Sequence, residues 1–534
     1  MKKQFLHHLL ILPILLLSSM LHAQSSLTSV NDPVYEFLNR QAIKGRIQFD
    51  SEVLPKSRSV VVDKLKELEE FQLEMNEIES DELDWFIEKF EIDEGFTLSG
   101  FGYKDSSFSL SATPIVGYGI SNWGGKSGTN RSFGIKVNAT YGQNWGIDIN
   151  MTDNGEIGDN VDREKLFSPR TGYDEIGAPN GIEFSDVQAG ITYTSDWGEI
   201  SFRKGYNKWG NGKFGKLILG TNSASFPQIN LKINPVPWLR FYYMHGWLNS
   251  QVIDYNYYDS TKSIFESSLH RFIPKYIAIN MLTVSPWDWM NISMGNSSVY
   301  SGDVRAEMLI PFMFFKYLDR DVGKGSIEDG NGSLFFEYYL KYPKNFGFYY
   351  TFYLEVTELR RVFQSDLRNT WFGYTIGGTA VDLFVHNLDL FVEYTKINPW
   401  VYEHKDVTTT YKHLGYDLGH WIGQNADQFR IQINYQPVHR VKIQSYFENY
   451  RKGDLDDISL AYGLDEIPAK EFLYGNVRTE TTLGLEVQYE YLKDTYAKLA
   501  LKNINVTDED PDRTLEFKRG NNISFSFGLY YGFD

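Results

Sequence analysis

The sequence contains no cysteine among its 534 residues. This absence excludes disulfide bonds, thiolate metal sites and lipid attachment at a cysteine. After residue 23 there is also no run of 18 apolar residues, so helical membrane spans are excluded there. Hydrophobic residues nevertheless make up 42% of the chain and aromatic residues 16%. These totals suit a soluble protein and a membrane-spanning β-barrel equally, and only the order of the residues separates the two.

Basic charge is scarce in this chain. The net charge at pH 7 is −17, and the acidic excess is concentrated between Glu67 and Glu94. That stretch holds thirteen acidic residues and one lysine, Lys89, which leaves a net charge of only −5 for the rest of the chain. Because no basic stripe is present, we expect no nucleic-acid partner.

The first 23 residues have the pattern of a secretory signal peptide. Lys2 belongs to a basic start, an apolar run extends from Leu9 to Leu17, and Ala23 ends a small-residue cleavage site. An anchoring helix would need about 20 apolar residues, whereas this run is shorter and contains Pro13. We therefore predict that residues 1–23 direct export and are removed.

Residues 24–96 show a helical period and predict a small bundle of three helices. The first helix is expected to start at Asp32–Pro33 and to end at Gly45, the second is carried by apolar residues from Val61 to Ile78, and the third is expected to begin at Ser80. Two interpretations of the acidic face remain open. It is a solvated surface, or the bundle caps the periplasmic mouth of a barrel, since about 60 residues alone would have a marginal core.

The last twelve residues, 523–534, alternate with a period of two. The odd positions are large and apolar or aromatic, and the even positions are mostly small or polar. The odd positions are Ile523, Phe525, Phe527, Leu529, Tyr531 and Phe533. An exposed edge strand of this kind would be a template for aggregation, so we expect it to pair with an earlier strand and to close a sheet.

Similar alternation begins near Thr97 and recurs in hairpins such as 333–355 and 429–448. Its strands run to about ten residues, which favours a membrane wall around a polar lumen over a soluble sandwich, whose strands average about five or six. Tight turns are predicted at 235–237, 286–288, 343–345, 437–440 and 493–495. Long connections are predicted near 153–188, 249–271, 301–330, 400–427, 451–480 and 503–521. This asymmetry is typical of short periplasmic turns and long external loops, and residues 97–534 suffice for about 16 to 18 strands.

Several motifs suggest chemistry that their context does not support. Gly210 to Gly215 fits the three-glycine dinucleotide pattern, but the following residues continue as strand, so we expect the glycines only to permit a crowded turn beside Trp209. The seven histidines after the signal peptide form no metal-binding motif, and no Gly-x-Ser-x-Gly elbow is present. Acidic pairs arise by chance among 69 acids. We expect no metal site, no cofactor and no enzyme activity.

The acidic pairs that could have served glycosidase chemistry are Asp382 with Asp389 and Glu355 with Glu358. The long segment 400–427 is more informative, because aromatic residues mingle there with carboxylates and amides. Flat aromatic faces beside such groups suit sugar rings, which offer apolar C–H patches and a fringe of hydroxyls. An aromatic girdle at the membrane boundary would give the same composition, and both interpretations stay open. The residues predicted to contact glycan are Trp400, Tyr402, Tyr416, Trp421 and Asp427.

Five segments together resemble the Wzi family of outer-membrane capsule assembly proteins, in the form found in Bacteroidetes-type bacteria. They are Asp32 to Leu38, Trp209 to Pro227, Tyr300 to Gly302, Glu393 to Pro399 and Leu418 to Asp427. Their order and spacing span about 400 residues and carry the resemblance. The chain departs from the family at Asn211 and Gln424, where proline is frequent.

The resemblance implies an all-β transmembrane fold: an antiparallel outer-membrane barrel of 18 strands (97–534), preceded by a periplasmic helical bundle that plugs it (24–96). It also implies a lectin-like, non-enzymatic role in assembling or attaching capsule or exopolysaccharide at the cell surface. The expected partners are surface polysaccharide, outer-membrane lipid, and polysaccharide export or cell-surface machinery. Alternatives are an adhesion or gliding-motility component, a porin-type channel and an outer-membrane hydrolase. A TonB-coupled transporter would need a longer N-terminal plug.

Overall fold

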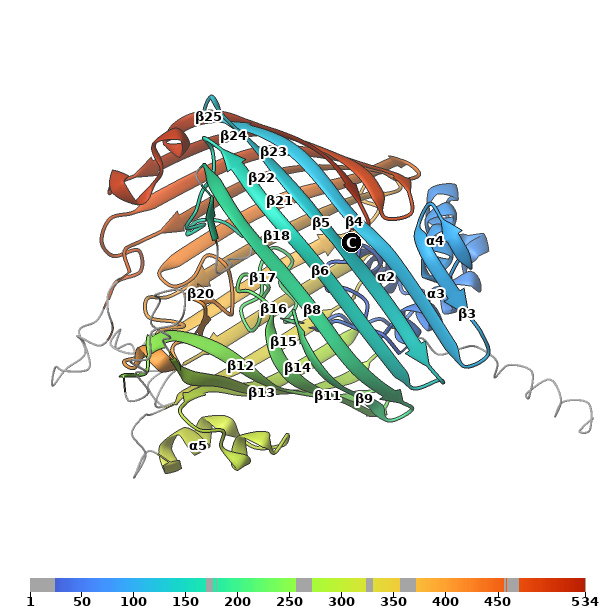
Figure 1. Cartoon of the computed structure of the whole chain (residues 1–534), viewed down its shortest axis with the longest axis horizontal. Coiled ribbons are helices and arrows are strands. Elements are labelled where there is room, and N and C mark those ends of the chain that lie inside the picture. Colours follow the sequence, from blue (N-terminus) through green and yellow to red (C-terminus); the bar gives the residue numbers. More distant parts are fainter. Residues whose placement is uncertain are drawn as a thin grey trace, which may run out of the picture.

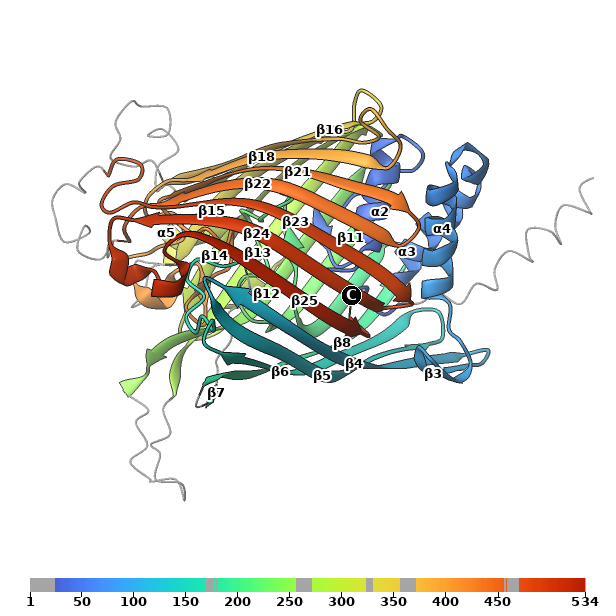
Figure 2. The same cartoon turned by 90° about the horizontal axis from the view of Figure 1, so that it is seen from above.

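A computed structural model describes residues 25–169, 176–178, 180–255, 271–322, 330–355, 371–455, 458 and 470–533. The predicted signal peptide, Glu358 and parts of the long external segments lie outside these residues. The chain is a closed antiparallel β-barrel with helices at one end (Figures 1 and 2). Among the described residues, no helix is both long and apolar enough to cross a membrane.

The barrel wall consists of 18 strands within the described part of the chain, as predicted. In chain order they are β4 (Phe108–Trp123), β5 (Lys126–Tyr141), β6 (Trp145–Gly158), β8 (Gly181–Ser195), β9 (Gly198–Gly205), β11 (Phe226–Val236), β12 (Leu239–Ile253), β13 (Phe272–Trp287), β14 (Met290–Ser301), β15 (Asn331–Leu340), β16 (Phe346–Leu354), β17 (Phe372–Ala380), β18 (Leu388–Ile397), β21 (Ala426–Val438), β22 (Val441–Lys452), β23 (Arg478–Leu492), β24 (Thr495–Asp508) and β25 (Gly520–Tyr531). Each pairs with the next.

The last strand closes the barrel, which confirms the prediction for the C-terminal stretch. β25 pairs with β4 from Ser524 opposite Trp123 to Tyr531 opposite Val116. Along β25, the odd-numbered apolar side chains from Ile523 to Leu529 are exposed on the outer face, and the serines between them are half-buried on the lumenal face. Alternation with this parity gives a wall that is apolar outside and polar inside.

All five predicted tight turns lie at the end of the barrel that bears the helices. There the backbone N–H of Asn345 donates to the carbonyl of Ile43 at 3.1 Å, and Lys493 donates to the carbonyl of Glu88 at 2.9 Å. Short turns mark this as the periplasmic end. Exposed aromatic residues ring it. They are Trp145, Trp197, Trp238, Trp287, Tyr342 and Tyr491. The membrane-boundary girdle is therefore built at the turns.

The N-terminal helices are α2 (Val34–Ile43), α3 (Arg58–Glu69) and α4 (Glu77–Phe90). Two predicted limits are wrong: α3 ends at Glu69 instead of continuing to Ile78, and α4 begins before Ser80. A short 3₁₀ turn, Gln72–Glu74, separates the two helices. The reason is a capping box, in which the Asn76 side chain accepts from the N–H of Glu79 and the Glu79 carboxylate accepts from the N–H of Asn76.

The helices share a core of their own, which includes Val34, Leu38, Val61, Leu65 and Leu83. The chain between α2 and α3 enters the lumen, where the short strand β1 (Val53–Leu54) pairs with β10 (Lys208–Trp209). A hairpin of β2 (Gly95–Thr97) and β3 (Gly100–Lys104) then leads to the barrel wall at β4. The N-terminal part therefore contributes a periplasmic bundle and a segment of the lumenal filling.

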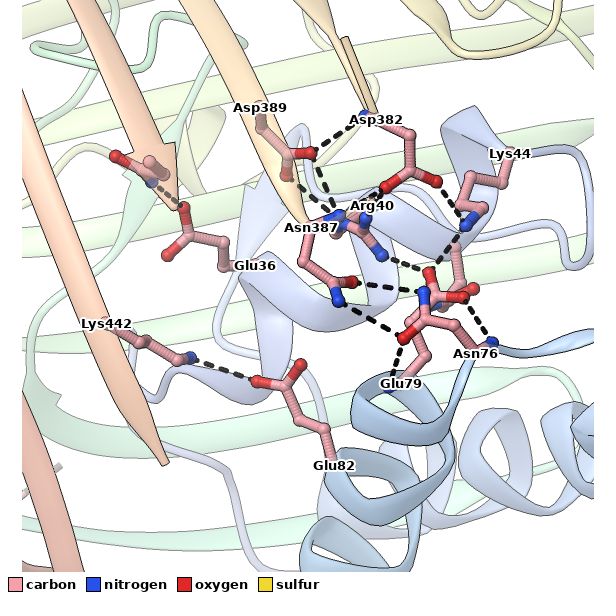
Figure 3. Close-up of polar contacts among 12 residues, drawn as sticks. Glu36, Arg40, Lys44, Asn76, Glu79, Glu82, Asp382, Asn387, Asp389 and Lys442 are labelled. Atoms are coloured by element: carbon pink, nitrogen blue, oxygen red, sulfur yellow. Dashed lines mark hydrogen bonds and ion pairs between the residues drawn. The ribbon is translucent and has the colours of Figure 1, made fainter. Parts of the chain in front are cut away.

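Ion pairs join the helices to the periplasmic end of the barrel (Figure 3). The Arg40 guanidinium pairs with Glu79 of α4 and with Asp382 and Asp389 of the β17–β18 hairpin. Lys44 bridges two of the same carboxylates, at 2.6 Å from Glu79 and 2.5 Å from Asp382. These side chains are only 1% to 12% exposed, so the pairs are largely shielded from water. The acidic pair Asp382 and Asp389 is thus part of a structural ionic lock.

Candidate functional site

Two connections from the external end fold back into the lumen. One links β9 to β11 (206–225), and the other links β18 to β21 (398–425) and contains β19 (Lys412–His413) and β20 (Tyr416–Asp417). The first was not among the long connections predicted from the sequence. The two touch directly: the N–H of Gly220 donates to the carbonyl of Leu418 at 2.7 Å, and the Tyr402 hydroxyl donates to the carbonyl of Leu217 at 2.7 Å. Together they form an inner plug.

The inner plug is apolar where its two connections meet. Its fully buried side chains include Trp209, Leu217, Ile218, Leu219, Tyr402, Tyr411, Leu418 and Ile422. This cluster continues into the wall through Ile277, Ile279 and Met281 of β13, which are completely buried and face inward. Burial on this scale is the main stabilising contribution to the plug. The side of the lumen facing β11 to β18 is therefore filled.

The glycine-rich stretch 210–215 lies in the inner plug and is anchored by two wall carboxylates. Glu393 accepts from the N–H groups of Lys213 at 2.5 Å and Phe214 at 3.2 Å, and Glu337 accepts from the N–H of Asn211 at 3.0 Å. A Cβ at Gly215 would overlap the imidazole of His420. The glycines allow the crowded turn that the sequence predicted, and the N–H groups that a phosphate would need are already bonded.

The histidines of the inner plug are buried structural groups. His420 has no exposed surface, and burial lowers its pKa to about 3. Burial also lowers the pKa of His413 to about 3, helped by the charges of Lys275 and Lys204. The ring nitrogen Nδ1 of His413 accepts from the N–H of Asn249 at 2.9 Å. Both rings are therefore neutral at pH 7.

Trp400 and Tyr402, two of the five predicted contact residues, are buried in the inner plug. Both have left-handed backbone conformations, with φ of 66° and 74°. Such angles are costly for bulky residues. Acceptors hold them in place, since the N–H of Trp400 donates to Gln424 at 2.6 Å and that of Tyr402 to Glu355 at 2.7 Å. The girdle interpretation does not apply to them, because a girdle residue faces lipid.

Asp427 lies on the opposite side of the wall from the inner plug. It is the second residue of β21, on the same face as Phe429, which is exposed on the outer surface. Its carboxylate accepts from Arg451 at 2.9 Å (Nε) and 2.5 Å (Nη2), and from the Tyr394 hydroxyl at 3.0 Å. Asp427 therefore belongs to the outer rim and does not share a surface with the lumenal aromatic residues.

Trp421 and Tyr416 are half-buried and keep part of their surface in solvent. The Trp421 ring packs against Tyr450 of β22 at 5.2 Å between centroids, and its Nε1–H donates to the carbonyl of Phe214 at 3.2 Å. The Tyr416 hydroxyl donates to the carbonyl of Glu164 at 3.0 Å, in the β6–β8 connection. These two aromatic residues thus lie where the inner plug meets the wall and the external loops.

Beside Trp421, inward side chains of β21 and β22 form a ledge of aromatic and charged groups. The Arg430 guanidinium lies over the Phe214 ring at 4.5 Å and the Tyr446 ring at 3.9 Å. It also donates to Glu448 at 3.0 Å. This ledge, Phe214, Trp421, Arg430, Tyr446 and Glu448, was missed at the sequence level. Alternation places Arg430 and Glu448 on the lumenal face, but nothing in the sequence brings Phe214 to them.

The lumen beyond the ledge is open to solvent. Lys498 and Lys502 of β24 point inward, yet their side chains are 45% and 32% exposed. Lys502 lies 3.1 Å from Glu486 of β23 and 5.8 Å from the Tyr446 ring, so this charged surface continues the ledge. The lumen is therefore filled on one side and wet on the other. A partly exposed aromatic ledge with flanking donors and acceptors can receive a polar ring that has apolar C–H faces.

Residues 104–516 match the family described as capsule assembly protein Wzi. The chain belongs to the Wzi family. Among solved structures, Wzi from Escherichia coli, described as a carbohydrate-binding outer-membrane β-barrel involved in group 1 capsule assembly, aligns with a TM-score of 0.59 and 13% identity, over 96% of this chain and 100% of that one. OprD from Pseudomonas aeruginosa aligns with a TM-score of 0.42 and 9% identity, over 79% and 94% of the two chains. No curated protein matches the sequence.

The family match confirms the resemblance drawn from the five sequence segments. The predicted fold class is also confirmed, since this Wzi-family chain shares the barrel fold of the Escherichia coli protein. With its apolar outer wall and its girdle of aromatic residues, the Wzi-family barrel is an outer-membrane protein.

Proposed function

We propose that this Wzi-family barrel binds surface polysaccharide and helps to assemble or attach a capsule or exopolysaccharide layer. The observation that carries the proposal is the ledge around Trp421, where partly exposed aromatic faces adjoin Arg430 and Glu448 on the wet side of the lumen. Sugars are bound by such surfaces through stacking on C–H faces and hydrogen bonds to hydroxyls. The description of the Escherichia coli protein as carbohydrate-binding supports the same role.

The five residues predicted from the sequence take different parts in this proposal. Trp421 and Tyr416 contact the glycan, because each of these residues is only half-buried. Trp400 and Tyr402 hold the inner plug that presents them, because both are buried. Asp427 is only 3% exposed and already accepts from Tyr394 and Arg451, so it orients Arg451, whose side chain is 43% exposed, toward a polysaccharide strand that lies across the outer rim. Binding needs no covalent step, so the protein acts without catalysis.

The test is retention of polysaccharide extracted from the protein's own cell surface by the detergent-purified, heat-modifiable barrel, with an unrelated polysaccharide as control. We expect selective retention, and Trp421→Ala should weaken it about tenfold, which corresponds to about 1.4 kcal/mol of lost stacking. Trp238→Ala is the matched control, because Trp238 lies at a periplasmic turn and is exposed there. Equal effects of the two substitutions would contradict the ledge as the binding surface.

The other proposed partners are outer-membrane lipid and polysaccharide export or cell-surface machinery. A second experiment addresses the cellular role. Deletion of the gene that encodes the chain should release polysaccharide from cells into the medium. Loss of surface adhesion or gliding with the polysaccharide layer intact would favour the adhesion alternative. Release of a cleaved product from glycan or lipid by the purified barrel would contradict the non-enzymatic role.

A further inference from the structure

The outer wall between β11 and β15 contains polar residues where lipid-facing residues are expected. Directly paired residues of an antiparallel sheet share one face. Exposed Ile200 pairs with Leu231, which pairs with Tyr243, and that row continues across β13 and β14 through Asn280 and Asn296. Both asparagines therefore point outward, although they are only 6% exposed. Polar groups facing hydrocarbon without partners are costly, so this part of the wall needs a cover.

The next row toward the external end repeats the pattern. It contains His245, Ala278 and Ser298, which are paired in register and have no exposed surface. The His245 ring donates to or accepts from the Tyr300 hydroxyl at 2.8 Å, and the rings of Trp247 and Tyr276 lie within 4.9 Å and 5.8 Å of it. A buried histidine on the outside of a barrel wall again shows that another segment covers this surface.

The cover is the outer strap, residues 302–318, which follows β14 and includes a 3₁₀ turn (Ala306–Leu309) and the start of helix α5 (Phe315–Val322). Figure 1 shows α5 outside the wall, below β13. The side chain of Asn280 donates to the carbonyls of Pro311 and Met313, both at 2.8 Å. The Tyr243 hydroxyl donates to the carbonyl of Met308 at 2.8 Å. The outward polar groups of the wall thus donate hydrogen bonds to backbone carbonyls of the strap.

The strap is also anchored by apolar contacts on its inner side. Met308 and Phe315 are fully buried against Phe241, Tyr243 and Tyr300 of the wall. The ring of Phe312 stacks on that of Phe241 with 4.4 Å between centroids. Phe241 lies two residues from the periplasmic-side start of β12. The strap therefore extends along the wall well away from the external end at which it leaves β14.

On its outer side the strap exposes a compact group of large apolar residues. They are Leu309, Ile310, Phe312, Phe314 and Tyr317. Phe312 is 69% exposed, and Lys316, the one charged residue from Leu309 to Tyr317, points toward the wall and donates to the carbonyl of Gly332. The charged residues Asp303, Arg305 and Glu307 lie before this group, toward the external end. Leu282 and Met294, which pair in one row with Phe241, are exposed on the bare wall beside the strap. The apolar surface of the strap is continuous with the lipid-facing surface of the barrel.

We propose that residues 309–317 of the outer strap lie within the membrane against the barrel and that their exposed side chains contact the acyl chains of outer-membrane lipid. Three observations carry this assignment: an apolar outer face, strap carbonyls satisfied by side chains of the wall, and continuity with lipid-facing Leu282 and Met294. Non-helical backbone is tolerated at membrane depth only where its polar groups are bonded within the protein. The strap replaces a polar part of the wall with a lipid-compatible one.

The absence of cysteine from the sequence makes a clean test possible. Single nitroxide labels are attached to Phe312→Cys and Phe314→Cys in the full barrel reconstituted into phospholipid vesicles. Collision of the label with oxygen, which concentrates in hydrocarbon, is compared with collision with a water-soluble nickel chelate. Phe202→Cys is the lipid reference, because Phe202 is 58% exposed on the bare outer wall of β9, and Leu73→Cys is the water reference, because Leu73 is fully exposed near the helices.

We expect the oxygen-to-nickel ratio at Phe312 and Phe314 to equal that at Phe202 and to exceed that at Leu73 several-fold. A ratio like that of Leu73 would overturn the proposal, because the strap would then be in water. Low collision rates with both reagents would also overturn it, since a second copy of the chain would then cover the patch. If Phe312→Cys fails to fold, as judged by heat-modifiability, Tyr317→Cys provides the same readout on α5.

Discussion

Arg40 is the residue through which α2 holds both α4 and the barrel, and its removal gives a quantitative test of the ionic lock. In Arg40→Ala, Glu79 keeps Lys44 at 2.6 Å and Arg46 at 3.1 Å, and Asp382 keeps Lys44. Asp389, in contrast, loses the cation that lies 3.1 Å from it. Breaking a buried ion pair from one side costs about 3 to 5 kcal/mol. Because two of the three carboxylates retain a cation, we take the lower value of about 3 kcal/mol.

Cysteine labelling can measure this loss, because the chain has no other thiol. Leu38 lies in α2, two residues before Arg40, and has no exposed surface, so a thiol at Leu38→Cys reacts with a maleimide only when the helix leaves its site. A loss of about 3 kcal/mol raises the population of that open form, and with it the labelling rate, by about 10²-fold. Alanine is a good helix former, so the substitution does not weaken α2 itself.

The matched control is Lys64→Ala in the same Leu38→Cys background. Lys64 pairs with Glu67 on the surface of α3, where the two side chains are 28% and 41% exposed. Exposed pairs contribute about 0 to 1 kcal/mol, so the labelling rate should rise less than about fivefold. If Arg40→Ala accelerates labelling no more than Lys64→Ala does, the lock does not hold the helices and the assignment is wrong.

Three further predictions concern other parts of the molecule. Burial raises the pKa of Glu79, but Arg40 and Lys44 more than offset this and lower the pKa to about 2, from an ordinary value of 4.5. The contribution of Glu79 to stability is therefore complete above about pH 4.5 and is lost as the pH falls toward 2. We expect pepsin to cleave the helical region faster at pH 2.5 than at pH 4.5. Glu393→Ala leaves the N–H groups of Lys213 and Phe214 without their acceptor, at a cost of about 1 to 3 kcal/mol each, so trypsin should cleave after Lys213. Glu183→Ala breaks an exposed pair with Arg131 and should leave the cleavage pattern unchanged. In Gly377→Ala the new methyl group would overlap the ring of Tyr349, which is fixed by a 2.6 Å hydrogen bond to Glu393. This substitution should destabilise the barrel by about 1 to 3 kcal/mol, measured as a lower midpoint of the heat-modifiability transition. At the neighbouring Gly378 an added methyl group meets only an ordinary contact, so Gly378→Ala should leave the midpoint unchanged.

The wall of this protein was predictable because its signal is local. A strand of period two shows its outward and inward faces residue by residue, and the pairing of β25 with β4 follows once the last strand needs a partner. The limits of α3 and α4 were not predictable from apolar spacing alone. The capping box of Asn76 and Glu79 decides them, and Asn76 lies inside a run whose apolar residues continue the helical period.

The candidate site was less predictable, because the sequence does not show on which side of a wall a loop folds. Trp400, Tyr402 and Trp421 have the composition of an external aromatic loop, yet the loop turns inward and buries two of them. The position of Asp427 could have been found from parity, since it alternates in phase with the outward Phe429. The contact of Phe214 with Arg430 joins residues more than 200 positions apart and has no counterpart in the local sequence.

The two ends of the lumen are closed by different chemistry, and this separates their responses to acid. In the ionic lock at the periplasmic end, the pairs of Glu79 with Arg40 and Lys44 keep their full contribution down to about pH 4.5, because these cations lower the pKa of Glu79. The inner plug contains His413 and His420, each with a pKa lowered to about 3 from an ordinary 6.5. A histidine buried in its neutral form stabilises the fold fully above pH 6.5 and loses this contribution as the pH falls toward 3.

At pH 5, each of these histidines has therefore lost about 2 kcal/mol of stability, while Glu79 of the ionic lock still makes its full contribution. We expect a thiol at Leu418→Cys, a position with no exposed surface in the inner plug, to react with dithiodipyridine much faster at pH 5 than at pH 7 after correction for the reagent's own pH dependence. A thiol at Leu38→Cys should show no such change. The double variant His413→Asn/His420→Asn keeps an acceptor near the position of each Nδ1 for the N–H groups of Asn249 and Ile422 but cannot titrate, so it should abolish the difference at Leu418. Persistence of the difference in that variant would show that another group loosens the plug, because neither replacement changes charge in this range.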